Sequence, residues 1–380
     1  MTMKKEFCRI CGQELFPEIL LELHNMPAAA QNFPTAETLA GDHGMDLELR
    51  QCSCCGVVQL TNPPVPYFRD VIRASGCSPE MHEFRLKQFS QWLRDFQLEH
   101  ARILEVGCGK GEYLEIMREA GGEVYGTEHL DESVQVCREH GLTVEQIYFE
   151  HGDEKLKNGP FGGFFILNWL EHIPDLHTFL RGIRNNLVPD AAGLVEVPNF
   201  NMMLKKGLSA EFTADHLYYF TEETFRVTLE SCGFQVLSCR PVWHDYILSA
   251  NVRRKQPLDT SLFRRKQQTL VREINAFVGR YGKTAIWGAG HQALAVMAMA
   301  ELDRKICYVV DSAPFKQGKF THATHLPIVP PDTLKNDTPD AVLVMCAGFS
   351  DEVARILREQ YDPAIRIGIL REDHVEELSC

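Results

Sequence analysis

Four cysteines form two C-x-x-C pairs, Cys8–Cys11 and Cys52–Cys55, with forty residues between the pairs. Each C-x-x-C turn presents two sulfurs on one side of a tight loop, and four thiolates bind zinc tetrahedrally. The pattern therefore predicts a zinc site made by Cys8, Cys11, Cys52 and Cys55. We expect this zinc to be structural, because a fourth thiolate closes the metal to water. The alternative is a group of free, buried cysteines.

A second chemical pattern is a glycine-rich loop. The apolar run Arg102 to Val106 leads into Gly107-Cys-Gly109-Lys-Gly111, with Glu105 just before it. Glu128 ends the next strand-like run, seventeen residues after Gly111, where a carboxylate is placed to accept both hydroxyls of a ribose. The G-x-G-x-G spacing differs from the G-x-G-x-x-G of a dinucleotide site. It resembles motif I of class I S-adenosylmethionine-dependent methyltransferases.

By this resemblance, Asn168 at the end of a later strand-like run lies beside the cofactor, so the expected cofactor site comprises Glu105, Gly107, Gly109, Gly111, Glu128 and Asn168.

Two histidines follow predicted strand ends, where open α/β sheets bind ligands. His172 lies in Asn168-Trp-Leu-Glu-His-Ile-Pro-Asp175, and His216 in Phe212-Thr-Ala-Asp-His-Leu-Tyr-Tyr-Phe220. Their positions make them candidates for acid–base chemistry. For either one, the alternative is an ordinary structural histidine.

These residues depend on a predicted α/β scaffold. Ser78-Pro79 is typical of a helix start, and strand-like runs at 102–106, 123–127, 164–167 and 193–197 alternate with helical segments. We expect a zinc-binding domain (1–74), a methyltransferase core (75–252) and a C-terminal Rossmann-like α/β domain (253–380). The fold class is α/β, with a class I methyltransferase Rossmann-like core.

The C-terminal block has its own glycine loop, Gly288-Ala-Gly290-x-x-Ala293, and Asp311 ends the following strand-like run. Alone, this pattern indicates a dinucleotide site and an NAD-dependent oxidoreductase. The block is short for a separate catalytic domain. It could also be a scaffold that binds nothing.

Composition narrows the class of protein. The net charge of −13 disfavours a nucleic-acid binder, which needs a basic face. No apolar run approaches the roughly 20 residues of a membrane span. The segment MTMKKEFCRICG has no apolar core like that of a secretory signal, so we expect a cytoplasmic protein with no membrane partner.

Nearly end to end, the chain resembles the sugar C-methyltransferase family, S-adenosylmethionine-dependent enzymes that methylate C3 of nucleotide-linked 4-keto-deoxysugars. The resemblance rests on the four-cysteine region, the core, the segments 172–174 and 215–220, and the C-terminal stretches 308–319 and 326–328. It implies a nucleotide-sugar substrate, a role in deoxysugar biosynthesis, and a C-terminal domain that helps to bind the substrate.

The resemblance also implies roles for single residues. His216 is the expected base that removes a C–H proton to form an enolate, Asp215 precedes it, and His172 lines the same pocket. Tyr218 is expected to contact the substrate, with Gly288 and Gly290 near its phosphates.

Three departures from the family keep an alternative open. Thr213-Ala-Asp215-His216 replaces the usual Tyr-x-Glu-His, and residues 73–78 lack an expected tyrosine. Motif I is Gly-Cys-Gly-Lys-Gly, nearer the general methyltransferase form than the family's usual Ser-Asn-Asp-Gly type. A hydroxyl acceptor needs only one base, so a sugar O-methyltransferase is the nearest alternative. A non-catalytic binding protein that kept the cofactor fold is the other.

Overall fold

The computed structural model describes residues 6–31, 33–70 and 77–378. The chain divides into two compact units, Met1–Gln256 and Pro257–Cys380. The predicted boundary after residue 74, and residues 73–76 of the segment that lacks a tyrosine, lie outside the described residues. The division into three domains stays a prediction.

The larger unit is built on a seven-stranded sheet in the order β10-β11-β8-β7-β4-β5-β6. Its strands are β4 (Arg102–Val106), β5 (Glu123–Glu128), β6 (Val144–Gln146), β7 (Phe161–Leu167), β8 (Leu187–Pro198), β10 (Phe234–Val242) and β11 (Ile247–Arg254). β4 to β8 pair in parallel, whereas β11 is antiparallel to both of its neighbours. This is the strand order of a class I methyltransferase sheet, with its one antiparallel strand inserted before the last.

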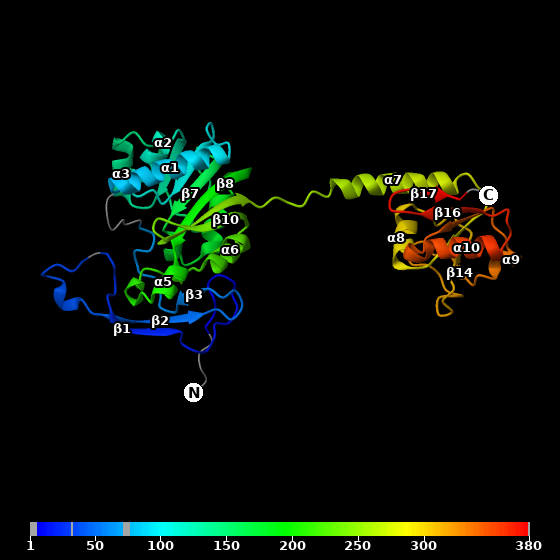
Figure 1. Cartoon of the computed structure of the whole chain (residues 1–380), viewed down its shortest axis with the longest axis horizontal. Helices are drawn as coiled ribbons and strands as arrows, with labels where there is room; N and C mark the ends of the chain where they lie inside the picture. Colours follow the sequence, from blue (N-terminus) through cyan, green and yellow to red (C-terminus); the bar gives the residue numbers. More distant parts are fainter. Residues whose placement is uncertain (1–5, 32, 71–76, 379–380) are drawn as a thin grey trace. The chain divides into compact units, whose positions relative to one another are not determined.

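Helices cover both faces of this sheet because its parallel strands are apolar on both sides. The helices are α1 (Pro79–Asp95), α2 (Glu112–Glu119), α3 (Asp131–Glu139), α4 (Leu176–Arg184), α5 (Phe200–Lys206) and α6 (Glu222–Ser231), with the 3-10 turns η2 (Leu170–His172) and η3 (Ser209–Glu211). Apolar residues of α1, α2 and α3 share one core, and those of α4 and α6 share another (Figure 1).

The helix start predicted at Ser78-Pro79 is confirmed. Ser78 is the N-cap of α1, its side-chain oxygen accepts a hydrogen bond from the Met81 N–H at 3.2 Å, and Pro79 takes the first helical position. Phe89, Trp92 and Leu93 then bury the apolar side of α1. The predicted strand at 102–106 is also confirmed, and those predicted at 123–127, 164–167 and 193–197 differ only at their ends.

A smaller antiparallel sheet joins the cysteine-rich region to the core. Its order is β1-β2-β3-β9, with β1 (Leu21–Met26), β2 (Met45–Gln51), β3 (Val58–Leu60) and β9 (Tyr218–Tyr219), and the turn η1 (Leu39–Gly41) lies between β1 and β2. The first three strands come from the N-terminal region, whereas β9 begins two residues after His216. The N-terminal region therefore shares a sheet with the segment that carries this histidine.

The smaller unit is a second α/β fold with a six-stranded sheet, in the order β14-β13-β12-β15-β16-β17. The strands are β12 (Thr284–Trp287), β13 (Val309–Val310), β14 (Ile328–Val329), β15 (Ala341–Val344), β16 (Arg366–Leu370) and β17 (Val375–Glu377). The helices are α7 (Ser261–Val278), α8 (His291–Met299), α9 (Thr333–Asn336) and α10 (Ser350–Gln360), with the turn η4 (Ala347–Phe349). Within the described chain, no helix is long and apolar enough to cross a membrane.

A buried ion pair ties α1 to β8. Arg85 donates from Nη1 to Glu196 Oε2 at 2.5 Å, both side chains are fully buried, and Gln88 Nε2 donates to the other carboxylate oxygen at 2.6 Å. Arg85→Met is expected to lower the free energy of unfolding by about 3–5 kcal/mol, because it leaves the Glu196 charge buried without its cation. Urea unfolding measures this loss. The exposed neighbour provides the control Lys87→Met, and a similar small effect in both variants would contradict the prediction.

Candidate active site

A cavity of about 400 Å³ lies where the N-terminal region meets the carboxyl end of β7. The N-terminal region contributes Ala30, Val65 and Tyr67 to its wall. The core contributes residues from three segments: Asn168 after β7, Glu171 and His172 of η2, and Thr213, Asp215 and His216 before β9. The structure thus brings both candidate histidines, Asp215 and Asn168 to one cavity.

The glycine loop at the end of β4 is closely packed. Gly107 has φ of +74°, and a Cβ built on it would lie 2.3 Å from the Trp169 ring, so only glycine fits there. The Gly109 N–H donates to Glu128 Oε2 at 2.9 Å, while Oε1 of Glu128 accepts the N–H groups of His129 and Leu130. Glu128 is therefore held against the loop, and burial raises its pKa.

Asn168 shows how the site could hold a polar ligand. It has φ of +49°, lies directly after β7, and its Oδ1 is buried without a hydrogen-bond partner among the described residues. A buried polar atom without a partner is uncommon and indicates a group that a ligand satisfies. Glu105 is buried in β4, two residues before Gly107. The glycine loop, Glu128 and Asn168 fit the amino acid and ribose parts of S-adenosylmethionine.

His172 and His216 pack against each other. Their ring centroids are 4.8 Å apart at an interplanar angle of 87°. Burial lowers the pKa of His172 to about 4, partly opposed by Asp215. Burial and the neighbouring His172 hold the pKa of His216 well below its usual range. Both imidazoles are therefore neutral near pH 7, and a neutral imidazole can accept a proton.

Asp215 faces away from a simple pairing with His216. Both of its carboxylate oxygens accept from the Tyr67 hydroxyl at 3.1 Å, and Oδ1 also accepts the Ala30 N–H at 3.0 Å. Burial and the adjacent Asp215 raise the pKa of Tyr67 to about 12. Tyr67 therefore supplies a phenol to the cavity wall, although the segment before His216 has Thr213 where the family has a tyrosine. It lies far from His216 in the chain, and sequence reasoning missed it.

Glu171 is a second residue that sequence reasoning missed. Its side chain is 1% exposed, and Oε1 lies 3.8 Å from His172 Nε2 and 4.0 Å from His216 Nε2. Burial raises the pKa of Glu171 to about 8. The signal in the sequence that points to Glu171 is its position directly before His172.

Tyr218, predicted to contact substrate, lies outside the residues that line the cavity. Its hydroxyl donates to the Pro174 carbonyl at 3.0 Å, and its ring stacks on Phe220 with centroids 5.6 Å apart. Its role in substrate binding stays a prediction.

The four predicted metal ligands come together. The sulfurs of Cys8, Cys11, Cys52 and Cys55 lie within 4.8 Å of one another, with Cys8–Cys55 at 3.7 Å and Cys11–Cys52 at 3.4 Å. Around a tetrahedral zinc with Zn–S bonds of about 2.3 Å, sulfurs lie about 3.8 Å apart, so the set fits this ion. Cys54 is exposed.

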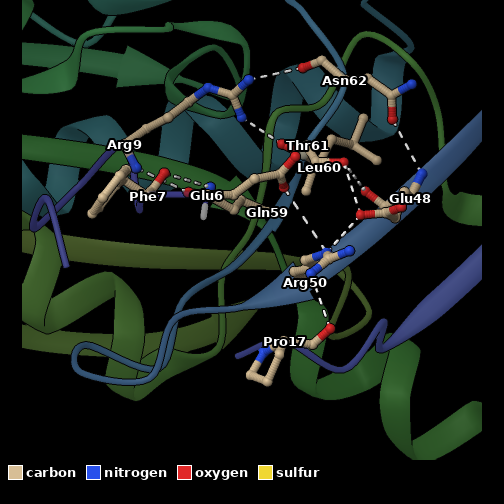
Figure 2. A network of polar contacts seen from close by, with 10 residues as sticks. All are labelled: Glu6, Phe7, Arg9, Pro17, Glu48, Arg50, Gln59, Leu60, Thr61 and Asn62. Carbon is tan, nitrogen blue, oxygen red and sulfur yellow. Dashed lines mark hydrogen bonds and ion pairs between the residues drawn. The ribbon is translucent and has the colours of Figure 1, made fainter. Parts of the chain in front are cut away.

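Arg9, inside the first cysteine loop, ties this cluster to β3 (Figure 2). Its guanidinium donates to the carbonyl of Leu60 and, at 2.8 Å, to that of Asn62, while its backbone N–H donates to Gln59 Oε1 at 3.1 Å. Because β3 pairs with β9, the cysteine cluster is connected through two strands to His216.

The second glycine loop has a tight backbone of its own. Gly288 has φ of +118°, and a Cβ there would lie 2.5 Å from the Met345 carbonyl oxygen, whereas Gly290 is open. The Asp311 carboxylate accepts the Ala289 N–H at 2.9 Å and pairs with Lys316 at 2.8 Å. These internal partners account for Asp311 without a bound dinucleotide, so they do not favour the oxidoreductase hypothesis.

Family comparisons agree with this geometry. A model described as a methyltransferase domain matches residues 81–239, and one described as a C-methyltransferase C-terminal domain matches residues 260–370. The C-methyltransferase NovU of Streptomyces niveus is 23% identical over 91% of this chain and 90% of its own length. The chain is a methyltransferase, and it is similar to S-adenosylmethionine-dependent C-methyltransferases over most of its length.

Other relatives match a smaller share of this methyltransferase. A ubiquinone biosynthesis O-methyltransferase of Alkalilimnicola ehrlichii is 37% identical over 37% of the chain, which is 58% of that relative. Among solved structures, an S-adenosylmethionine-dependent methyltransferase from Aquifex aeolicus is 20% identical, covers 47% of this chain and 95% of its own, and has a TM-score of 0.38. Residues 260–370 match, in addition, the domain described as the C-terminal domain of C-methyltransferases.

The methyltransferase is expected to lose cofactor binding when Gly107 is changed to Ala, because the added Cβ meets Trp169. Calorimetric titration should show affinity for S-adenosylhomocysteine reduced at least about tenfold, or 1.4 kcal/mol. Gly121→Ala is the matched control, since Gly121 also has positive φ (+104°) but nothing within 4 Å of its Cβ. It should cost about 1 kcal/mol of stability and leave binding intact. Equal affinities in the two variants would contradict the prediction.

Proposed function

We propose that this methyltransferase acts on a nucleotide-linked keto-deoxysugar and methylates a carbon next to the ketone, with His216 as the base. The observation that carries the proposal is the cavity that holds two neutral, partly buried histidines at the carboxyl end of the sheet. Its volume of about 400 Å³ suits a small-molecule acceptor.

The chemistry requires two functions of the chain. A C–H group beside a ketone becomes a nucleophile only as an enolate, so a base must take the proton and a donor must hold the oxyanion. His216 takes the proton, because its imidazole is neutral and faces the cavity. His172, also neutral and 4.8 Å away between ring centroids, supplies an N–H to the enolate oxygen.

S-adenosylmethionine supplies an electrophilic methyl group on its sulfonium sulfur. The proposed binding residues are Glu105, Gly107, Gly109, Gly111, Glu128 and Asn168. Glu128 holds the loop through Gly109, and the Oδ1 of Asn168 is free to bind a polar group of the ligand. Positioning of the two reactants supplies much of the rate in such a displacement.

The nucleotide-sugar substrate is supported by the resemblance of the whole chain to sugar C-methyltransferases and by the C-methyltransferase C-terminal domain. Gly288 and Gly290 are the proposed phosphate-side residues of that domain. The four-cysteine cluster is proposed to bind structural zinc. We place the protein in the cytoplasm, where thiols stay reduced.

The function is tested with S-adenosylmethionine and a panel of dTDP- and UDP-4-keto-6-deoxyhexoses, with mass spectrometry to detect the methylated product and NMR to locate the methyl on carbon. Exchange of the acceptor C–H proton in D₂O, with S-adenosylhomocysteine bound, separates enolate formation from O-methylation. Methyl found on oxygen would favour the O-methyltransferase alternative.

His216→Asn is expected to lower methyl transfer and proton exchange by about 10²–10⁴-fold, because the general base is lost. Affinity for S-adenosylhomocysteine should be unchanged, since the glycine loop is intact. His100→Asn, at an exposed position, is the control. Full activity of His216→Asn would overturn the assignment of the base.

The metal prediction concerns the cysteine cluster. Purified protein is expected to contain one zinc per chain by elemental analysis, and Cys8→Ser should lose it, whereas Cys54→Ser should keep it. Loss of the metal loosens the connection through β3 and β9, so methyl transfer should fall as well. Each 1 kcal/mol lost lowers Tm by roughly 2–4 °C in a unit of this size. Protein that folds and turns over without zinc would contradict the prediction.

A further inference from the structure

Glu171 is held at the junction of the two histidine segments. It lies in η2 beside His172, and its backbone carbonyl accepts the Leu217 N–H at 2.7 Å, one residue after His216. The side chain is 1% exposed. This backbone bond fixes the carboxyl group next to the proposed base.

The carboxyl group of Glu171 can accept further hydrogen bonds. Its Oε1 lies 3.8 and 4.0 Å from the Nε2 atoms of His172 and His216, and its Oε2 is buried with no hydrogen-bond partner. Among the residues that the structure describes, no lysine or arginine pairs with it. The two imidazoles are therefore the groups whose positive charge, when they are protonated, Glu171 can stabilise.

Asp215, although adjacent to His216 in sequence, already accepts hydrogen bonds from other groups. Its oxygens accept from the Tyr67 hydroxyl and the Ala30 N–H, so it fastens the N-terminal region to the cavity wall. A carboxylate that holds these two donors is a poorer partner for a new charge on His216. The catalytic role predicted for Asp215 from the sequence stays a prediction.

We propose that Glu171 is the positioning residue that stabilises the imidazolium formed on His216 during the reaction. The inference rests on the proposed function. The acceptor C–H bond breaks, its proton forms an N–H bond on His216, and the electron pair passes through the enolate to the new carbon–methyl bond as the sulfonium S–C bond breaks. Glu171 carries the negative charge that offsets the imidazolium until the proton leaves to water.

The pH dependence follows from the groups that face Glu171. These are His172 on its own turn, Asp215 and His216 on the following loop, and Tyr219 on β9. Since burial and the neighbouring His172 hold the pKa of His216 well below its usual range, His216 is already neutral at pH 7. Glu171, whose pKa burial raises to about 8, becomes an anion only above that pH. The rate should therefore rise as the pH passes through about 8. This pH is higher than the one at which an ordinary histidine base loses its proton.

The test is the pH profile of kcat between pH 6 and 10, with dTDP-4-keto-6-deoxyhexose as acceptor. Wild-type kcat is expected to rise about tenfold between pH 7 and pH 9, following ionisation of one group. Glu171→Gln should abolish the rise and lie at least about tenfold below wild type at pH 9, with unchanged affinity for S-adenosylhomocysteine. Glu211→Gln, the same change at an exposed site, should keep the wild-type profile. A rise that persists in Glu171→Gln overturns the proposal.

An infrared measurement gives a readout without the acceptor. At pH 7 the wild-type protein should show a C=O stretching band of a protonated carboxylic acid that disappears by pH 9 and is missing from Glu171→Gln. If the wild-type spectrum at pH 7 lacks this band, the proposed role of Glu171 is overturned. This outcome does not depend on whether Glu171→Gln folds. Absence of methyl transfer by wild-type protein overturns the proposed function instead, so the two failures are distinguishable.

Discussion

The pairing of β3 with β9 is the constraint on which the site depends. Only two residue pairs, Val58 with Tyr219 and Gln59 with Tyr218, form the ladder, and the Leu60 N–H extends it to the Leu217 carbonyl at 3.0 Å. Leu217 in turn donates to the Glu171 carbonyl. One chain of backbone bonds thus links the cysteine region, the loop of His216 and the turn of His172. A small region with little core of its own becomes a wall of the cavity, and a metal at its far end would stiffen that wall.

The electrostatics of the cavity follow from this enclosure. Two imidazoles and one carboxyl group lie within 4.8 Å of one another, and burial favours the neutral form of all three. A neutral site binds an uncharged ketone without competing ion pairs. In the proposed reaction a proton moves onto His216, and Glu171, whose Oε1 lies 4.0 Å from His216 Nε2, is the proposed group that offsets the charge. Burial keeps His216 neutral before the reaction. By the same effect, its protonated form is proposed to depend on the carboxylate of Glu171.

Much of the scaffold was predictable because it rests on local patterns. The strand into Gly107, the cap at Ser78 and the pairing of the four cysteines each need only a few neighbouring residues. Tyr67 and Glu171 were not predictable, because their roles arise from contacts with residues 148 and 45 positions away. β9 is only two residues long and owes its conformation to β3, so no periodicity reveals it. Sequence also does not show whether Asp215 contacts His216, since neighbours in an extended segment face different ways.

The two glycine loops of the chain show how one backbone motif acquires different uses. In each, a carboxylate at the end of the second strand binds an N–H of the loop, from Gly109 in the core and from Ala289 in the C-terminal unit. Asp311 then pairs with Lys316, which satisfies its charge internally. Glu128 accepts only backbone N–H groups and pairs with no lysine or arginine within the described residues, so its remaining lone pairs suit the hydroxyl donors of a ribose. The partner of the carboxylate, more than the spacing of the glycines, therefore distinguishes the two loops.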